Sequence, residues 1–327
     1  AMWERYSTSL VSVLFFLTMT IPVLIAGPFG ADRATATLLR WGLALHALII
    51  AAIVCGRGYW MPAVKRLCPR GPLPVPVAEG GWLRSLAITL TLTPLLALTL
   101  RHLVLLARPG VTVALPVLEW GTIVGSHFAA YSLGVPLLLM TAAFVLYAAR
   151  ERSAHFAIAA LLMLNLAAST VVIVANLAAG LSFATAGMVS FFQWNAVVSA
   201  AGTVACLLAR RWIEPQDATP SWSALHLSSP LEFPVQLAGG LTAFLATWAA
   251  AAIIAAPAVS PAVAGLLGGP LSFVALALAI LAACLYYRDL ASFSRMTLIP
   301  IGALSAATFL AAAFERWQPG QPWGSYH

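Results

Sequence analysis

Apolar runs of about twenty residues recur along the whole chain, and they constrain its fold more than any other feature. An α-helix rises about 1.5 Å per residue, so about twenty residues cross a hydrocarbon core roughly 30 Å thick. Inside that core the backbone N–H and C=O groups must bond to each other, which a helix achieves within one segment. The sequence therefore predicts an all-α, polytopic integral membrane helix bundle.

We expect about nine transmembrane helices, within a range of eight to ten. Their approximate ranges are 8–27, 36–55, 86–107, 117–148, 155–180, 184–212, 236–257, 262–287 and 296–314. Only a few residues separate the fifth range from the sixth, and so short a connection predicts that these two helices form an antiparallel hairpin.

Composition agrees with this prediction and excludes several classes of function. Of the 327 residues, 61% are hydrophobic and 8% are charged, whereas about 25% are charged in soluble domains. The net charge of +7 does not indicate nucleic-acid binding, because the basic residues lie in short loops between apolar runs. The four cysteines form no C-x-x-C pair, so neither a disulfide framework nor a thiolate metal site is predicted.

The distribution of basic residues predicts an orientation in the cell inner (plasma) membrane. Twelve of the 17 Lys and Arg residues fall on one side of the alternating pattern, and this side is expected to be cytoplasmic. The N-terminus is then cytoplasmic and the C-terminus extracytoplasmic. The loop at 258–261 carries no charge, so the last three helices are the least constrained.

A proline-rich segment predicts the domain organisation. Residues 213–235 contain four prolines and are expected to form an extended cytoplasmic connection. They separate a six-helix membrane bundle, 1–212, from a three-helix part with a short extracytoplasmic tail, 236–327. In the second part, small residues are expected to allow close helix packing. These are Gly239, Gly240, Gly265, Gly268 and Gly269.

Titratable and polar groups concentrate where the third predicted helix ends and the fourth begins. They are Arg101, His102, Arg108, Glu119, His127 and Tyr131. Each ionisable group inside a membrane is costly, which makes it a candidate for function. His127 and Tyr131 are four residues apart and share a helical face, and Glu119 lies two turns earlier on roughly the same side. The cluster is expected to line one extracytoplasmic pocket.

Imidazole and guanidinium donors beside an apolar wall suit the carbonyl oxygens of a quinone, whose tail the lipid would hold. His102 and His127 are then hydrogen-bond donors or proton acceptors, and Glu119 is a proton exit. Arg101 is an electrostatic anchor and Tyr131 a supporting donor. The alternative is that the arginines reach the interface and Glu119 pairs with one of them.

A b-type haem is the second cofactor considered. His46 and His127 each lie ten residues from the outer end of their predicted helix, so their imidazoles are expected at similar depths. Two such histidines on adjacent helices can ligate a haem iron axially. No other metal site is predicted, because no carboxylate and histidine cluster falls on one helical turn.

Neutral polar residues occupy the fifth and sixth predicted helices. They are Asn165, Ser169, Thr170, Asn176, Gln193 and Asn195. Hydrogen bonds between membrane helices are the commoner use of such residues, and we favour this interpretation over a path for a solute.

These features favour a membrane-embedded subunit of a respiratory or electron-transfer complex, surrounded by lipid and by other subunits, which binds quinone. No catalytic constellation is predicted. The alternatives are a permease for a small solute, with the fifth and sixth helices lining its path, and a purely structural membrane subunit.

Overall fold

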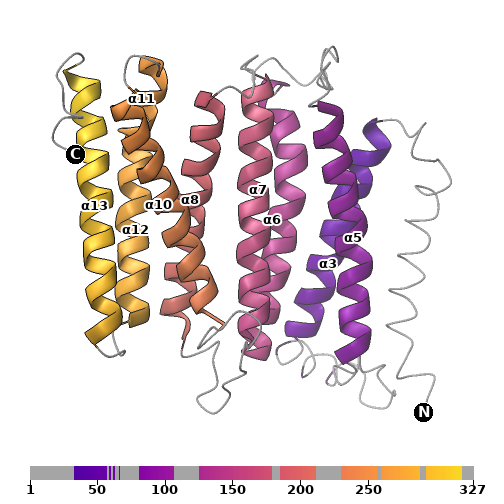
Figure 1. Cartoon of the computed structure of the whole chain (residues 1–327). Helices are drawn as coiled ribbons and strands as arrows, with labels where there is room; N and C mark the ends of the chain where they lie inside the picture. Colours follow the sequence, from indigo (N-terminus) through magenta and orange to yellow (C-terminus); the bar gives the residue numbers. More distant parts are fainter. Residues whose placement is uncertain are drawn as a thin grey trace. The chain divides into compact units, whose positions relative to one another are not determined.

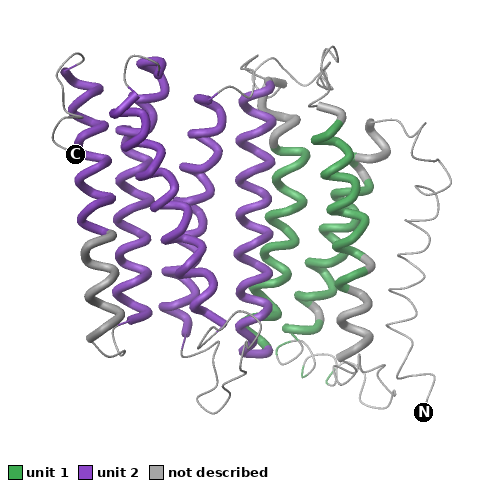
Figure 2. Tube along the Cα trace, viewed as in Figure 1, with its two compact units in different colours: residues 1–150 green, residues 151–327 purple. Residues whose placement is uncertain are grey.

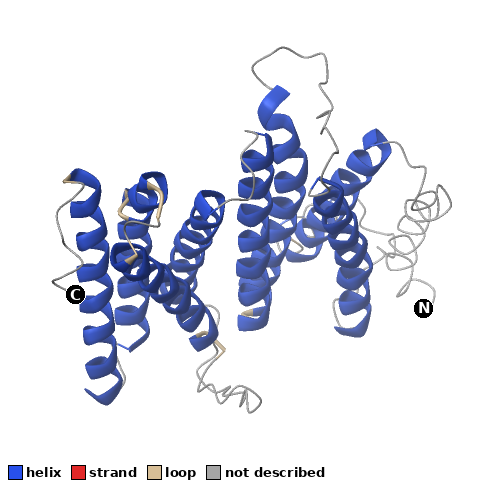
Figure 3. Ribbon diagram, turned by 45° about the horizontal axis from the view of Figure 1, so that its top comes forward, coloured by secondary structure: helices blue, strands red, loops and turns tan. Residues whose placement is uncertain are grey.

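The computed structural model describes residues 33–56, 59, 62, 66, 81–106, 125–178, 185–210, 230–255, 259–287 and 292–318. The regular elements within these ranges are helices, and no strand occurs among them (Figures 1 and 3). The prediction of an all-α fold is confirmed. The predicted first span, 8–27, lies outside the described residues.

Five helices of the described chain are long and apolar enough to cross a membrane. They are Tyr131–Glu151, Ala154–Leu177, Thr185–Leu208, Glu232–Ile254 and Pro261–Tyr287. Two shorter apolar segments, Leu39–Ala52 and Thr91–Val104, precede them in the sequence. The chain is therefore a multi-pass membrane helix bundle whose environment is the lipid bilayer.

The chain divides into two compact units, residues 1–150 (unit 1) and residues 151–327 (unit 2) (Figure 2). The division at 213–235 that the sequence predicts stays a prediction. The fifth and sixth predicted spans belong to unit 2 because the sixth packs against the helices that follow it, as described below for α8.

Unit 1 contains α3 (Arg33–Cys55), α5 (Gly81–Leu106) and α6 (Gly125–Glu151). α3 and α5 pack against each other.

Buried Leu39 and Leu43 of α3 contact Leu98 of α5. Leu98 shares a helical face with the buried Thr91 and Leu95, because the three follow the spacing of an α-helix. The Thr91 hydroxyl donates to the carbonyl oxygen of Ile88 at 3.0 Å, so its burial leaves no donor unpaired.

Unit 2 contains the remaining helices. They are α7 (Ala154–Ala178), α8 (Thr185–Leu208), α10 (Glu232–Ile254), α11 (Pro261–Leu267), α12 (Pro270–Tyr287) and α13 (Ser292–Trp317). α8 is the central element, since it packs against α7, α10, α11 and α12, while α13 packs against α10, α11 and α12.

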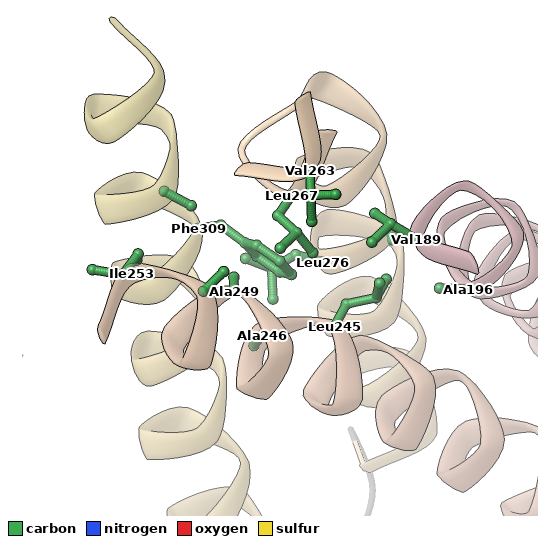
Figure 4. Close-up of a cluster of buried hydrophobic side chains, with 13 residues drawn as sticks. Val189, Ala196, Leu245, Ala246, Ala249, Ile253, Val263, Leu267, Leu276 and Phe309 are labelled. Carbon is green, nitrogen blue, oxygen red and sulfur yellow. The ribbon is translucent and has the colours of Figure 1, made fainter. Parts of the chain in front are cut away.

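The apolar core of unit 2 forms where α8, α10, α11, α12 and α13 meet (Figure 4). Leu245 and Ala249 of α10 and Leu267 of α11 are fully buried there, and Phe309 of α13 is buried with them. The Phe309 ring stands edge-on to Phe273 of α12, with 5.9 Å between the ring centroids. Small alanines alternate with these larger side chains, which lets the helices approach closely.

The predicted eighth span, 262–287, is interrupted in the structure. α11 ends at Leu267 and α12 begins at Pro270, which suits a helix start because proline has no N–H to satisfy. A Cβ on Gly268 would lie 2.7 Å from the carbonyl oxygen of Ala312 in α13. Only glycine fits there, so the interruption occurs where the chain passes directly against the α13 backbone.

Ending a helix leaves carbonyl oxygens without partners inside that helix. Gln193 of α8 donates from Nε2 to the carbonyl oxygen of Leu266 at 2.6 Å and to Ser272 Oγ at 2.9 Å. Arg316 of α13 donates from Nη1 to the carbonyl oxygen of Gly265 at 3.3 Å. The Leu266 oxygen also accepts from the Gly269 N–H at 2.9 Å, so side chains from two other helices add to the backbone hydrogen bonds of the interrupted segment.

The predicted role of glycines in close packing is confirmed for Gly268. It is wrong for Gly239 and Gly240 as contacts within the described chain, because a Cβ on either would meet no atom within 4 Å. Both lie on an exposed face of α10.

We expect Gly268→Ala to lower the stability of the protein, because its methyl group must displace the α13 backbone. Overpacking of this kind costs about 1–3 kcal/mol. The matched control is Gly240→Ala, whose methyl enters open space and gains helix propensity of up to about 1 kcal/mol. Thermal unfolding in nanodiscs checks this, and equal midpoints for the two variants would contradict the close approach of α11 to α13.

Candidate functional site

Arg40 of α3 is the most unusual side chain in unit 1, because it is a cation with 0% of its surface exposed. Its helical face continues with Ala44, Ala47 and Ala51, which are also buried. A long side chain on a helix points back toward the N-terminus. Accordingly Arg40 Nη2 donates to Thr37 Oγ1, one turn earlier, at 3.0 Å.

The second partner of Arg40 comes from α5. Arg40 Nη1 lies 3.3 Å from Nδ1 of His102. A guanidinium has only donors, so Nδ1 accepts this hydrogen bond and the imidazole carries its hydrogen on Nε2. The contact joins a residue near the start of α3 to one near the end of α5, as expected for antiparallel neighbours.

The remaining nitrogen of Arg40, Nε, differs from the other two among the described residues. Nε is buried and forms no hydrogen bond in the part of the chain that the structure describes. The described partners of Arg40, Thr37 and His102, are both neutral acceptors. Burying a charge without an opposite charge is costly, so this guanidinium is suited to receive an acceptor from a ligand.

The structure places the predicted site residues as follows. His102 is half-buried and contacts Arg40, whereas Arg101 beside it is exposed. Tyr131, in α6, is 55% exposed. His46 is half-buried and lies about 9 Å farther along α3 than Arg40, at about 1.5 Å per residue.

Three of the predicted residues fall outside what the structure describes. Glu119 and Arg108 lie in the segment 107–124, and only the helical backbone of α6 is described at His127. The predicted haem ligation by His46 and His127 and the predicted proton exit at Glu119 therefore stay predictions.

Sequence reasoning missed Arg40 and Thr37 as site residues. Arg40 was counted among the basic residues that set the orientation, although it falls inside the predicted span 36–55. The available signal was the row of alanines at the spacing of the Arg40 face, since small side chains leave volume for a long one. That signal does not reveal His102, because the pairing of α3 with α5 comes from the fold.

A second group of polar side chains joins α7 to α8. Ser169 Oγ donates to Asn195 Oδ1 at 2.9 Å, and Ser199 Oγ donates to Asn165 Oδ1 at 2.8 Å. Each amide nitrogen donates to a carbonyl oxygen of its own helix. The predictions of an antiparallel hairpin and of interhelical hydrogen bonding are confirmed, because the four side chains satisfy one another.

Asn176, near the end of α7, is the exception in that helix pair. Its Nδ2 is buried and has no hydrogen-bond partner in the described part of the chain. It follows Ser169 by seven residues and so shares the side of α7 that faces α8.

Within the described residues, no group of three or more His, Cys, Asp or Glu side chains is arranged to hold a metal ion. No protein-family model, curated protein or solved structure matches the chain. The Arg40–His102 pair is therefore the arrangement on which a functional argument must rest.

The bond between Ser169 and Asn195 makes a direct prediction for a double-mutant cycle. We expect Ser169→Ala and Asn195→Ala to destabilise the protein by amounts that are not additive, with a coupling energy of about 0.6 kcal/mol. The measurement is equilibrium unfolding in mixed micelles. Thr247 is a matched control partner, because its exposed hydroxyl donates to Ala243 in its own helix. Coupling of Ser169 to Thr247 as strong as to Asn195 would contradict the interhelical bond.

Proposed function

We propose that the chain is a membrane-embedded subunit of a respiratory or electron-transfer complex and binds a quinone beside Arg40 and His102. The observation that carries the proposal is the Nε of a fully buried arginine, which has no partner among the described residues. It is a fixed hydrogen-bond donor next to an imidazole, on two helices with apolar segments, Leu39–Ala52 and Thr91–Val104. A quinone supplies what this site lacks, since its ring oxygens accept hydrogen bonds and its tail partitions into lipid.

In this proposal, Arg40 and His102 have different roles. Arg40 takes the anchoring role that the sequence assigned to Arg101, because Arg40 is buried and Arg101 is exposed. His102 holds a proton at Nε2 while Nδ1 accepts from Arg40. The guanidinium fixes the imidazole ring and its tautomer, as a hydrogen bond to the other nitrogen does in general.

Leu39, Leu43 and Leu98 supply the apolar wall beside the polar pair.

Haem ligation by His46 and His127 is the second-ranked cofactor proposal. His127, Glu119 and Tyr131 keep their predicted roles as further donors and as the proton exit.

The contacts in unit 2 do not favour the permease alternative. Asn165, Ser169 and Asn195, which were expected to line a solute path, form hydrogen bonds between α7 and α8 instead. Asn176 is the exception, because its buried Nδ2 has no partner in the described chain. The interruption between α11 and α12 resembles the broken helices of transporters, but Gln193 and Arg316 occupy its carbonyl oxygens.

We expect Arg40→Gln and His102→Leu each to weaken the binding of a short-tailed quinone by about tenfold to a hundredfold. A hydrogen bond to a charged group contributes about 1.5–3 kcal/mol, and about 1.4 kcal/mol corresponds to a factor of ten. Quenching of tryptophan fluorescence by the quinone in nanodiscs gives the dissociation constant.

The matched controls are Arg150→Gln and His155→Leu, which remove the same groups from exposed positions. We expect both to bind the quinone like the original protein. Wild-type affinity in folded Arg40→Gln and His102→Leu proteins, checked by circular dichroism, would refute quinone binding at this site.

The assembly itself is tested separately. We expect native mass spectrometry of the gently solubilised particle to detect companion chains that carry redox centres, together with bound quinone. A lone chain or homo-oligomer without redox cofactors would count against an electron-transfer subunit and return attention to the permease alternative.

A further inference from the structure

The charge of Arg40 bears on the charge of the ligand, a property that the proposed binding of a quinone does not specify. Arginine stays protonated in proteins. Within the described residues, its hydrogen bonds go to a hydroxyl and to a neutral imidazole. The hydroxyl and the imidazole each accept a hydrogen bond from Arg40, and neither carries a negative charge.

We infer that the Arg40–His102 site selects an oxyanion carried on an apolar tail over the matching neutral ligand. The inference rests on the proposed function for the location of the site and adds the chemical class that binds best there. It extends the proposal because a neutral quinone oxygen satisfies Nε but adds no negative charge to a cation whose described partners are neutral.

One nitrogen of the guanidinium has no partner among the described residues. Nη1 is directed to His102 on α5 and Nη2 to Thr37 on α3, while Nε remains. Charged oxygens form shorter and stronger hydrogen bonds to guanidinium than neutral oxygens do. A surrounding of low dielectric constant strengthens the attraction between the opposite charges further.

Neither α3 nor α5 carries an aspartate or glutamate. Arg101, next to His102 in the sequence, is an exposed cation at the same end of α5. Exposed apolar side chains of the same two helices, Leu45 and Leu100, suit a hydrocarbon tail.

Two sources offer this chemistry. One is a lipid-soluble hydroxyquinone, whose ring hydroxyl ionises at neutral pH. The other is an acidic phospholipid, whose phosphate carries the charge and whose acyl chains are the tail. Both present an oxyanion on a hydrocarbon tail, so the experiment must separate them.

The experiment uses the full chain in nanodiscs of zwitterionic lipid at neutral pH. The first probes are a 2-hydroxy-3-alkyl-1,4-naphthoquinone, which is ionised, and its 2-methoxy analogue, which has the same ring and tail but no charge. The third probe is phosphatidic acid, added as a competitor. Dissociation constants are measured for the original protein and for Arg40→Gln, Arg40→Lys and Arg150→Gln.

We expect the ionised naphthoquinone to bind at least about tenfold more tightly than the methoxy analogue, a factor that corresponds to about 1.4 kcal/mol. The ratio is expected to fall close to one in Arg40→Gln and to persist in Arg150→Gln. Arg40→Lys keeps the charge, so it should keep a preference for the anion even where Arg40→Gln folds poorly. Because the ratio compares two ligands on one protein, a partial loss of folded protein does not change it.

The outcomes separate this inference from the proposed function. Equal affinity for both naphthoquinones, with dependence on Arg40, would overturn the anion preference and leave quinone binding intact. Binding of phosphatidic acid that depends on Arg40, with no binding of either naphthoquinone, would support the oxyanion site and refute the quinone proposal. A preference for the anion that survives in folded Arg40→Gln would overturn the assignment to Arg40.

Discussion

The structure depends on one constraint, which is that a polar group placed in hydrocarbon must find its partner within the protein. Unit 2 meets this constraint by pairing side chains across helices. Asn165, Ser169, Asn195 and Ser199 close two hydrogen bonds between α7 and α8, and Gln193 serves the interrupted segment before α12. Polar residues in this unit hold helices together in a defined register, because each bond forms at one relative position of the two helices.

Unit 1 departs from the same constraint at Arg40. The guanidinium is withdrawn from water, yet one of its donors lacks a partner in the described part of the chain. A cost of this kind persists in a protein when something other than stability maintains it. The functional proposal therefore concerns α3 and α5. The larger set of polar residues in α7 and α8 is explained by hydrogen bonds, except at Asn176.

Much of the fold could be predicted from the sequence, because the length of an apolar run relates directly to the thickness of a membrane. The α7–α8 hairpin followed from its short connection. The interruption at Gly268 could not be predicted, since its cause is the backbone of Ala312, more than forty residues later. His102 was predicted as a site residue from the clustering of titratable groups. Its partner Arg40 was treated as an orientation signal. The sequence around an arginine one turn inside an apolar run is the same whether the side chain reaches the membrane interface or turns inward.

The interrupted segment also has a consequence for the order in which the protein is made. The carbonyl oxygens at the end of α11 receive hydrogen bonds from Gln193, which is synthesised earlier than α11, and from Arg316, which is synthesised later. Gly268 likewise rests on α13. Chain that has emerged only as far as α12 lacks the Arg316 hydrogen bond to Gly265 and the α13 backbone beside Gly268. The packing of α11 is therefore completed only after α13 has been synthesised, so this part of unit 2 cannot finish folding in the order in which its helices are made.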